Sequence, residues 1–167
     1  GVVEIASASP ELFIARDGDE VLTGPIKGTG RTSADLLPKD RAENVMIVDL
    51  MRNDLSRVCA TGTVSVPDLL AEEEHPGLVH LVSRVRGVLA PGTSWPHVID
   101  ATFPPGSVTG APKLAAMAII DEVEPASRGP YCGAIGWVDA DTGRASLAVA
   151  IRTFWKSGGR VHFGTGA

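Results

Sequence analysis

The stretch Val79-His-Leu-Val-Ser83-Arg-Val-Arg-Gly-Val-Leu89 alternates two sets of side chains along its length. Leu81 and Val85 fall on one side of the alternation, and Arg84 and Arg86 fall on the other. Successive side chains of a strand point to opposite faces, so a period of two predicts a β-strand with one buried face. The sheet that contains this strand decides the fold class.

Further strands are expected on both sides of this stretch. Before it, Val2 to Leu22 holds short apolar runs broken at Ser9-Pro10 and at Asp17-Gly18-Asp19, which predicts strands joined by tight turns. The other predicted strands are Val64 to Val66, Gly133 to Asp139, Ala145 to Phe154 and Arg160 to Phe163. Because tight turns join antiparallel neighbours and need no crossover helix, the sheet should be antiparallel.

Three helices are expected between the strands. Pro38 precedes the segment Lys39 to Val58, in which side chains recur at intervals of three and four residues, the pattern of an amphipathic helix. The residues that set this pattern are Ala42, Val45, Met46, Asp49 and Leu50. A second helix is predicted from Ser94 to Thr102 and a third from Pro112 to Val123. Antiparallel strands with intercalated helices indicate an α+β fold.

Length and composition describe one globular domain. The chain has 167 residues, of which 44% are hydrophobic, enough to bury one core. A net charge of −5 without any run of Lys and Arg excludes nucleic acid and an anionic membrane surface as expected partners. The two cysteines, Cys59 and Cys132, match no metal spacing, and reduced thiols in a cytoplasmic protein fit them better than a disulfide.

Two charged residues, Lys27 and Glu43, are candidates for a catalytic or metal-binding role. Lys27 lies in Thr23-Gly-Pro-Ile-Lys-Gly-Thr29, where a desolvated amine could act as a nucleophile, although a solvated loop lysine is the plainer interpretation. Glu43 lies on the first predicted helix, where a carboxylate could hold magnesium or simply complement the helix dipole. Both alternatives remain open for both residues.

The segment Gly106-Ser-Val-Thr-Gly110-Ala-Pro-Lys113 places two glycines and two hydroxyls before a helix. Free N–H groups and the positive end of the helix dipole could attract an anion there, and a carboxylate is the expected guest. A phosphate loop would need lysine directly after the last glycine, whereas Ala111 and Pro112 intervene. An ordinary glycine-rich helix entry is the alternative.

Four further residues have a functional and a structural interpretation. Glu11 could be a general acid or an edge residue, and His80 could be a ligand or a hydrogen-bonded core histidine. Arg152 and Tyr131 could clamp a carboxylate, for which the arginine fork is well suited, or they could be structural.

The ordered set of these motifs resembles the chorismate-utilising enzymes over nearly the whole chain. The motifs are Ser9-Pro-Glu-Leu-Phe13, Pro25-Ile-Lys-Gly-Thr29, Lys39 to Leu55, His80-Leu-Val-Ser83, Gly106 to Lys113, Arg128 to Gly133 and Ile151-Arg-Thr153. The resemblance implies that residues 1–167 are a chorismate-binding catalytic domain, truncated at both ends. It also implies the fold, a portion of the family's antiparallel β-sandwich with flanking helices.

The resemblance assigns a role to each candidate residue. Lys27 would attack the chorismate ring, Glu11 would be the general acid, and His80 would orient substrate groups. Glu43 would hold magnesium against the ring carboxylate, while Arg152 and Tyr131 would hold the enolpyruvyl carboxylate. The residues Gly28, Thr109, Gly110 and Gly166 would complete the substrate site.

Within the resembled family, lysine in the Pro-Ile-x-Gly-Thr motif is typical of aminodeoxychorismate synthase component I, and alanine is usual in anthranilate synthases. Lys27 therefore predicts amination of chorismate to 4-amino-4-deoxychorismate, on the route to para-aminobenzoate and folate, with a glutamine amidotransferase partner supplying ammonia. The alternatives are an anthranilate, isochorismate or salicylate synthase. A non-catalytic chorismate-binding fragment is the alternative from a different class, because the acidic helix that relatives carry after Gly166 is absent.

Overall fold

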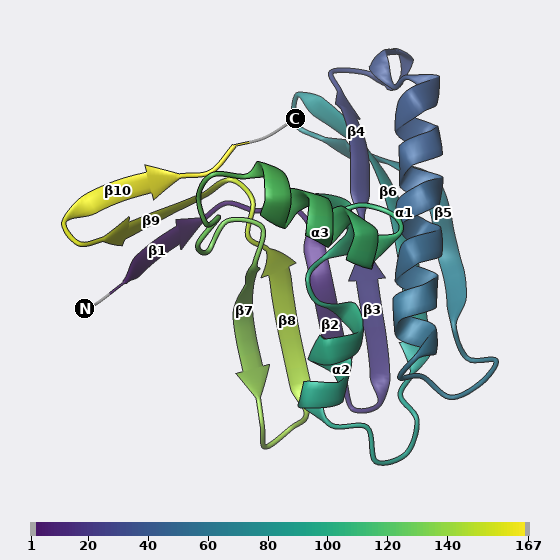
Figure 1. The fold of residues 1–167 in the computed structure, drawn as a ribbon. Helices are drawn as coiled ribbons and strands as arrows, with labels where there is room; N and C mark the ends of the chain where they lie inside the picture. The colour runs from purple at the N-terminus through teal and green to yellow at the C-terminus, as the bar shows by residue number, and fades with distance from the viewer. Residues whose placement is uncertain (1–2, 166–167) are drawn as a thin grey trace.

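Two antiparallel sheets dominate the computed structural model, which describes residues 3–165 (Figure 1). The smaller sheet has the order β1-β9-β10, and the larger one is built on the path β4-β6-β3-β2-β8-β7, with β5 on the free edge of β6. The small sheet consists of β1 (Glu4–Ser7), β9 (Thr153–Ser157) and β10 (Arg160–Phe163). The large sheet consists of β2 (Leu12–Asp17), β3 (Glu20–Gly24), β4 (Ile26–Gly30), β5 (Ser65–His75), β6 (Leu78–Val88), β7 (Ala134–Asp139) and β8 (Arg144–Val149). The predicted α+β class is confirmed.

The strand that decided the fold class is the centre of the large sheet. One edge of β6 pairs with β5, and the other edge pairs first with β4 and then with β3. The pairs Ile26↔Val82 and Thr23↔Val85 show that β3 and β4 form one line along this edge, interrupted at Pro25. Strand β4 therefore extends beyond the end of β2, which is paired with β3 alone on that side.

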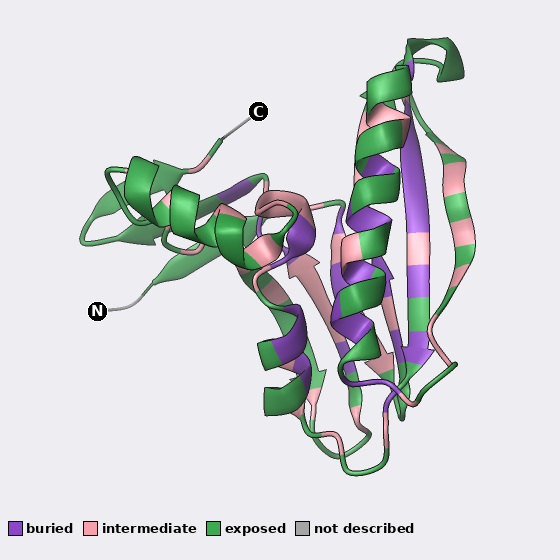
Figure 2. Ribbon diagram, turned by 45° about the vertical axis from the view of Figure 1, so that its right-hand side comes forward, coloured by how far each residue is buried: buried purple, intermediate pink, exposed green. Residues whose placement is uncertain are grey.

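Helix α1 (Pro38–Ser56) covers one face of this sheet, together with α2 (Trp95–Thr102) (Figure 2). The buried residues of α1 recur every three or four positions and so share one side of the helix; they are Asn44, Ile47, Val48, Met51, Asp54 and Leu55. The core that they share with the sheet and α2 includes Phe13, Ile14, Val21, Ile47, Val48, Met51, Leu55, Val85, Val98, Ala101 and Val149. Burial of this apolar surface is the main force that fixes α1 on β6.

The sequence-based choice of the buried face of α1 was wrong. Val45 and Met46, two of the residues that set the predicted stripe, are each 45% exposed. Helical spacing fits a second set of residues equally well, and that set packs on the sheet. It includes Asn44, whose amide donates to the carbonyl oxygen of Leu81 at 3.1 Å and accepts from the hydroxyl of Ser83. A polar residue is tolerated inside the core because its hydrogen bonds are satisfied.

The predicted strand from Ala145 to Phe154 is two strands in different sheets. Strand β8 ends at Val149 and β9 begins at Thr153, and between them Arg152 has a φ of 49°. A tight turn holds this break, because the N–H of Ile151 donates to the carbonyl oxygen of Val149 at 2.8 Å. The prediction missed the break because Ala150 and Ile151 continue the apolar run of β8.

The remaining elements are short. Two 3₁₀ helices, η1 (Ser33–Asp35) and η2 (Gly106–Val108), lie in the connections before α1 and after α2. Helix α3 (Lys113–Val123) begins directly after Pro112, which occupies the N-cap position. No helix within residues 3–165 is long and apolar enough to cross a bilayer.

Candidate functional site

The candidate residues gather at one end of the large sheet, where the chain passes between the two sheets. Glu11 lies just before β2, and Arg152 lies just after β8. Strands β2 and β8 are antiparallel neighbours, with Leu12 opposite Ala148, so these two positions meet at the same end. Tyr131 precedes β7, the next strand along, and is therefore brought to this end as well.

Backbone hydrogen bonds fix the segment before β2 against the segment after β8. The N–H of Val149 donates to the carbonyl oxygen of Glu11 at 3.0 Å, and the N–H of Ala8 donates to that of Arg152 at 3.1 Å. Residues 138 and 144 positions apart in the sequence are thereby held side by side by their backbone groups alone. This arrangement leaves the side chains of Glu11 and Arg152 free for other contacts.

Lys27 and Glu11 converge on Ser107. The Nζ of Lys27, on β4, donates to the carbonyl oxygen of Ser107 at 3.0 Å, and the lysine is partly buried. Glu11 is only 4% exposed, and its Oε1 atom is buried without a hydrogen-bond partner, as is the hydroxyl of Ser107. The Ser107 side chain nevertheless lies within reach of the Glu11 carboxyl, since it lowers the pKa of that group. A buried polar atom without a well-formed hydrogen bond is unusual in a folded protein and commonly marks a place that water or a ligand reaches.

The environment of Glu11 favours its protonated form. Burial raises the pKa of the Glu11 carboxyl, and the side chain of Ser107 and the charge of Lys27 act more weakly in the opposite direction. A buried carboxyl with a raised pKa that faces an amine is an arrangement suited to proton donation.

His80 is a buried, hydrogen-bonded residue of β6. Its Nδ1 atom lies 2.8 Å from the hydroxyl of Thr29, the last residue of the Pro25–Thr29 motif. Burial lowers the pKa of His80, and the neighbouring charges of His75 and Arg152 lower it further, while Glu73 raises it. The structure thus links His80 to the lysine motif through Thr29 and to Arg152 through charge, whereas its substrate-orienting role stays a prediction.

Gly28 allows β4 to approach α1. Its φ is +93°, and a Cβ atom added there would lie 2.9 Å from the Cβ of Asp40. Only glycine fits this position without displacing the helix or the strand. Glu43 follows Asp40 by three residues on α1, so the two share one side of the helix, and Glu43 is exposed.

Magnesium is compatible with Glu43 but is not held by the described residues alone. Within residues 3–165, no three His, Cys, Asp or Glu side chains gather closely enough to hold a metal ion. Magnesium commonly takes one or two protein carboxylates and completes its shell with water and substrate oxygens. An exposed carboxylate on the side of α1 that meets Gly28 fits this mode of binding.

The two remaining motifs border a common groove. Thr109 and Tyr131 both line a hollow of about 750 Å³ between α3 and the segment before β7. Arg128 joins the motifs directly, because its guanidinium donates to the carbonyl oxygen of Val108 at 2.9 Å. Gly110 lies in the loop before α3, three residues before Lys113, and Gly166 lies outside the described residues.

Ser107 is the residue whose importance the sequence did not show. The motif Gly106 to Lys113 was considered for its backbone N–H groups, whereas the structure brings a carbonyl oxygen to Lys27 and a hydroxyl to Glu11. The hydroxyl was visible in the motif, but its partners lie in segments 80 and more residues away.

Comparison with known proteins decides the family. The family model described as "chorismate binding enzyme" matches residues 1–167. This chain belongs to the chorismate-binding enzymes. Among relatives of that family, anthranilate synthase component 1 1 of Haloarcula marismortui is 46% identical over 99% of this chain. Aminodeoxychorismate synthase component 1 of Escherichia coli is 42% identical over 97% of it.

Solved chorismate-binding enzymes share the fold. The crystal structure of anthranilate synthase component I from Streptococcus pneumoniae superposes with a TM-score of 0.85 at 38% identity and covers 96% of this chain. This chain spans only 36% of the Haloarcula relative and 38% of both the Escherichia coli relative and the Streptococcus structure. The likeness therefore concerns one part of those longer proteins.

Proposed function

We propose that this chain is the chorismate-binding catalytic part of an aminodeoxychorismate synthase component I, which converts chorismate to 4-amino-4-deoxychorismate. The observation that carries the proposal is the convergence of the Lys27 amine and the buried Glu11 carboxyl on Ser107. An amine and a proton donor are the two groups that replacement of a ring hydroxyl by nitrogen requires.

Glu11 would be the general acid of the first step. A hydroxide ion is a poor leaving group, so the ring hydroxyl must be protonated as its bond to carbon breaks and water departs. The raised pKa of Glu11 keeps a proton on this carboxyl closer to neutral pH than an exposed glutamate would. Its Oε1 atom, which makes no hydrogen bond within the chain, would face the bound substrate.

Lys27 would be the nucleophile. The amine must first give up its ammonium proton to water, and its nitrogen lone pair then forms the bond from Nζ to the ring carbon as the carbon–oxygen bond breaks. Glu11 gives its proton to the departing hydroxide, which leaves as water, and the new secondary ammonium returns a proton to the Glu11 carboxylate. Ammonia then attacks the ring, forms the new carbon–nitrogen bond and returns the lysine as a free amine. The carbonyl oxygen of Ser107, 3.0 Å from Nζ, holds the amine in place before substrate arrives.

The carboxylates of chorismate would be held by cationic and polar groups around this pair. Arg152 is exposed at the sheet end and presents a guanidinium suited to a carboxylate, with Tyr131 on the neighbouring segment. Glu43 would hold magnesium, which when bound would neutralise the ring carboxylate and withdraw charge from the ring.

We infer a glutamine amidotransferase as the partner that supplies ammonia. The relatives at 46% and 42% identity are each called component 1, which implies a second component in those enzymes. The roles proposed here for Lys27 and Glu11 concern the activation of chorismate, and generation of ammonia from glutamine is a separate chemistry.

Anthranilate synthase component I is the second candidate. The 46% identity to the Haloarcula enzyme and the superposition on the Streptococcus enzyme favour it. Lys27 favours aminodeoxychorismate synthase, because an anthranilate synthase has no need of a lysine nucleophile at this position.

Product analysis tests the proposal. The complete protein is incubated with chorismate, magnesium and ammonia, and the products are separated by chromatography and identified by mass spectrometry. The proposal predicts 4-amino-4-deoxychorismate as the main product. Anthranilate would support the second candidate, and isochorismate or salicylate would overturn both.

A further inference from the structure

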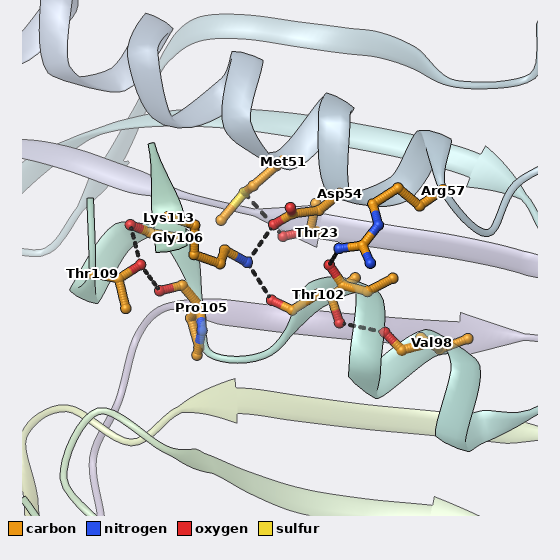
Figure 3. Close-up of polar contacts among 11 residues, drawn as sticks. Thr23, Met51, Asp54, Arg57, Val98, Thr102, Pro105, Gly106, Thr109 and Lys113 are labelled. Atoms are coloured by element: carbon orange, nitrogen blue, oxygen red, sulfur yellow. Dashed lines mark hydrogen bonds and ion pairs between the residues drawn. The ribbon is translucent and has the colours of Figure 1, made fainter. Parts of the chain in front are cut away.

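A buried ion pair lies next to the candidate site and belongs to none of the residues assigned above. The Nζ of Lys113 lies 2.5 Å from Oδ2 of Asp54 and donates to the carbonyl oxygen of Thr102 at 2.9 Å (Figure 3). The two charged side chains are 12% and 8% exposed. Figure 3 shows the lysine reaching between α1 and the end of α2.

This ammonium ties three helices together. Asp54 lies in the last turn of α1, Thr102 is the last residue of α2, and Lys113 is the first residue of α3. Because Lys113 binds the carbonyl oxygen of Thr102, the segment 103–112 between them is closed into a loop. Because Lys113 also binds Asp54, this loop is anchored on the helix that covers the sheet.

The closed loop carries the groups that meet Lys27 and Glu11. The carbonyl oxygen of Ser107 receives the Lys27 amine, and the Ser107 hydroxyl adjoins the Glu11 carboxyl. The loop lies tightly on α1, since a Cβ atom added to Gly106 would come within 2.7 Å of the Leu50 side chain. A shift of the loop would therefore move the acceptor of the lysine amine.

The electrostatics of the pair favour a positional role. Burial raises the pKa of Asp54, and the hydrogen bond and charge of Lys113 oppose this effect, helped by Arg57. Desolvation of two buried charges largely cancels their attraction, so such pairs add little net stability, whereas fixing one arrangement is their best-attested use.

We propose that Lys113 and Asp54 form a clamp that positions the 103–112 loop. In this position, Ser107 holds the Lys27 amine and the Glu11 carboxyl where both can reach the substrate. The effect of the clamp on catalysis rests on the proposed function, because it assumes that Lys27 and Glu11 act on chorismate. Both residues act through the loop and are positioning residues rather than catalytic ones. The geometrical part of the proposal concerns the Lys27 environment and can be measured without turnover.

Substitutions of the pair separate positioning from folding. Single variants Lys113→Met and Asp54→Asn leave one buried group without its partner, and they can fail to fold for that reason. The double variant Asp54→Leu with Lys113→Met removes both charges together and replaces them with apolar side chains, a change that folded proteins often tolerate. Lys113→Arg keeps the charge and donors, and Lys156→Met is the matched control in an exposed pair with Glu4.

Two readouts are measured on the complete protein: kcat and KM for chorismate, and the acetylation rate of Lys27 by acetic anhydride relative to exposed Lys39. In the folded double variant, kcat should fall about 100-fold, the effect of roughly 1 Å of misplacement, with a smaller change in KM. Lys27 should be acetylated several times faster, because its carbonyl acceptor has moved. The Lys113→Arg variant should retain a kcat and a Lys27 acetylation rate close to those of the wild type. The Lys156→Met control should match the wild type in both.

The outcomes are decisive in either direction. A folded double variant with wild-type kcat and wild-type Lys27 acetylation would overturn the clamp. Loss of the cooperative unfolding transition in the double variant would assign the pair to folding and would overturn it as well. If the wild type makes no 4-amino-4-deoxychorismate, the proposed function fails, yet Lys27 acetylation in the double variant still decides whether the clamp positions this residue.

Discussion

Glu11 is almost fully buried, lacks a partner for one oxygen and lies close to an amine. These features decrease the stability of the folded chain, because a buried carboxyl that ionises must give up its hydration. The same burial keeps the carboxyl protonated, which is what a proton donor requires. The same substitution should therefore change activity and stability in opposite directions.

Glu11→Gln should remove the proton donor and keep the volume of the side chain. We expect kcat/KM to fall by roughly 100-fold or more, the usual contribution of a general acid. In the wild type, kcat/KM should decrease as the pH rises through the raised pKa of Glu11, and this limb should be absent from the variant. A pH profile of kcat/KM checks both expectations, with the exposed Glu20→Gln as control.

Stability should respond in the other direction. The pKa of Glu11 is higher in the folded chain than in the unfolded chain, so the folded chain binds more protons between the two values. Stability of the wild type must then decrease as the pH rises across that window. Urea unfolding above the window should find Glu11→Gln more stable than the wild type, because glutamine has no charge to desolvate. Equal stability of the two proteins there would refute the burial argument.

At the scale of elements, alternation and helical spacing found most strands and all three α-helices, because both signals are local. Two errors share one cause. The break at Arg152 is held by backbone hydrogen bonds from Ala8 to Arg152 and from Val149 to Glu11, in addition to its own tight turn. The buried face of α1 is decided by contacts with β6. Local periodicity contains none of these distant contacts. The order of the motifs along the chain was enough to identify their residues. The contact of Ser107 with Lys27 joins residues 80 positions apart, so it depends on where the sheet places β4.

The contact of β4 with α1 gives a prediction for an element. Gly28→Ala would combine a left-handed backbone with a Cβ atom 2.9 Å from Asp40. Gly62→Ala is the matched control, because Gly62 has a φ of +82° but no atom within 4 Å of an added Cβ. We expect Gly28→Ala to be less stable than the control by about 1–3 kcal/mol, the range for overpacking. Equal unfolding free energies of the two variants would show that β4 does not need this close approach.

At the scale of the whole molecule, the large sheet brings Glu11 and Arg152, from opposite halves of the chain, to one end. Helix α1 approaches the same end, and its residue Glu43 is exposed there. If Glu43 holds magnesium, chelation should abolish turnover, and Glu43→Gln should raise the magnesium concentration needed for half-maximal activity by about tenfold or more. Asp49→Asn, on the same helix and paired with Arg52 at the surface, should leave this magnesium concentration unchanged. An unaltered magnesium requirement in Glu43→Gln would remove Glu43 from the metal site.

The fate of the Lys27 amine tests the central claim most directly. The complete protein is mixed with chorismate and magnesium without ammonia, then denatured, digested and analysed by mass spectrometry of the peptide that contains residue 27. The account predicts an adduct on Lys27 with the mass of chorismate less one water, which disappears when ammonia is added and is absent from Lys27→Ala. An unmodified Lys27 peptide, together with undiminished amination by Lys27→Ala, would contradict it.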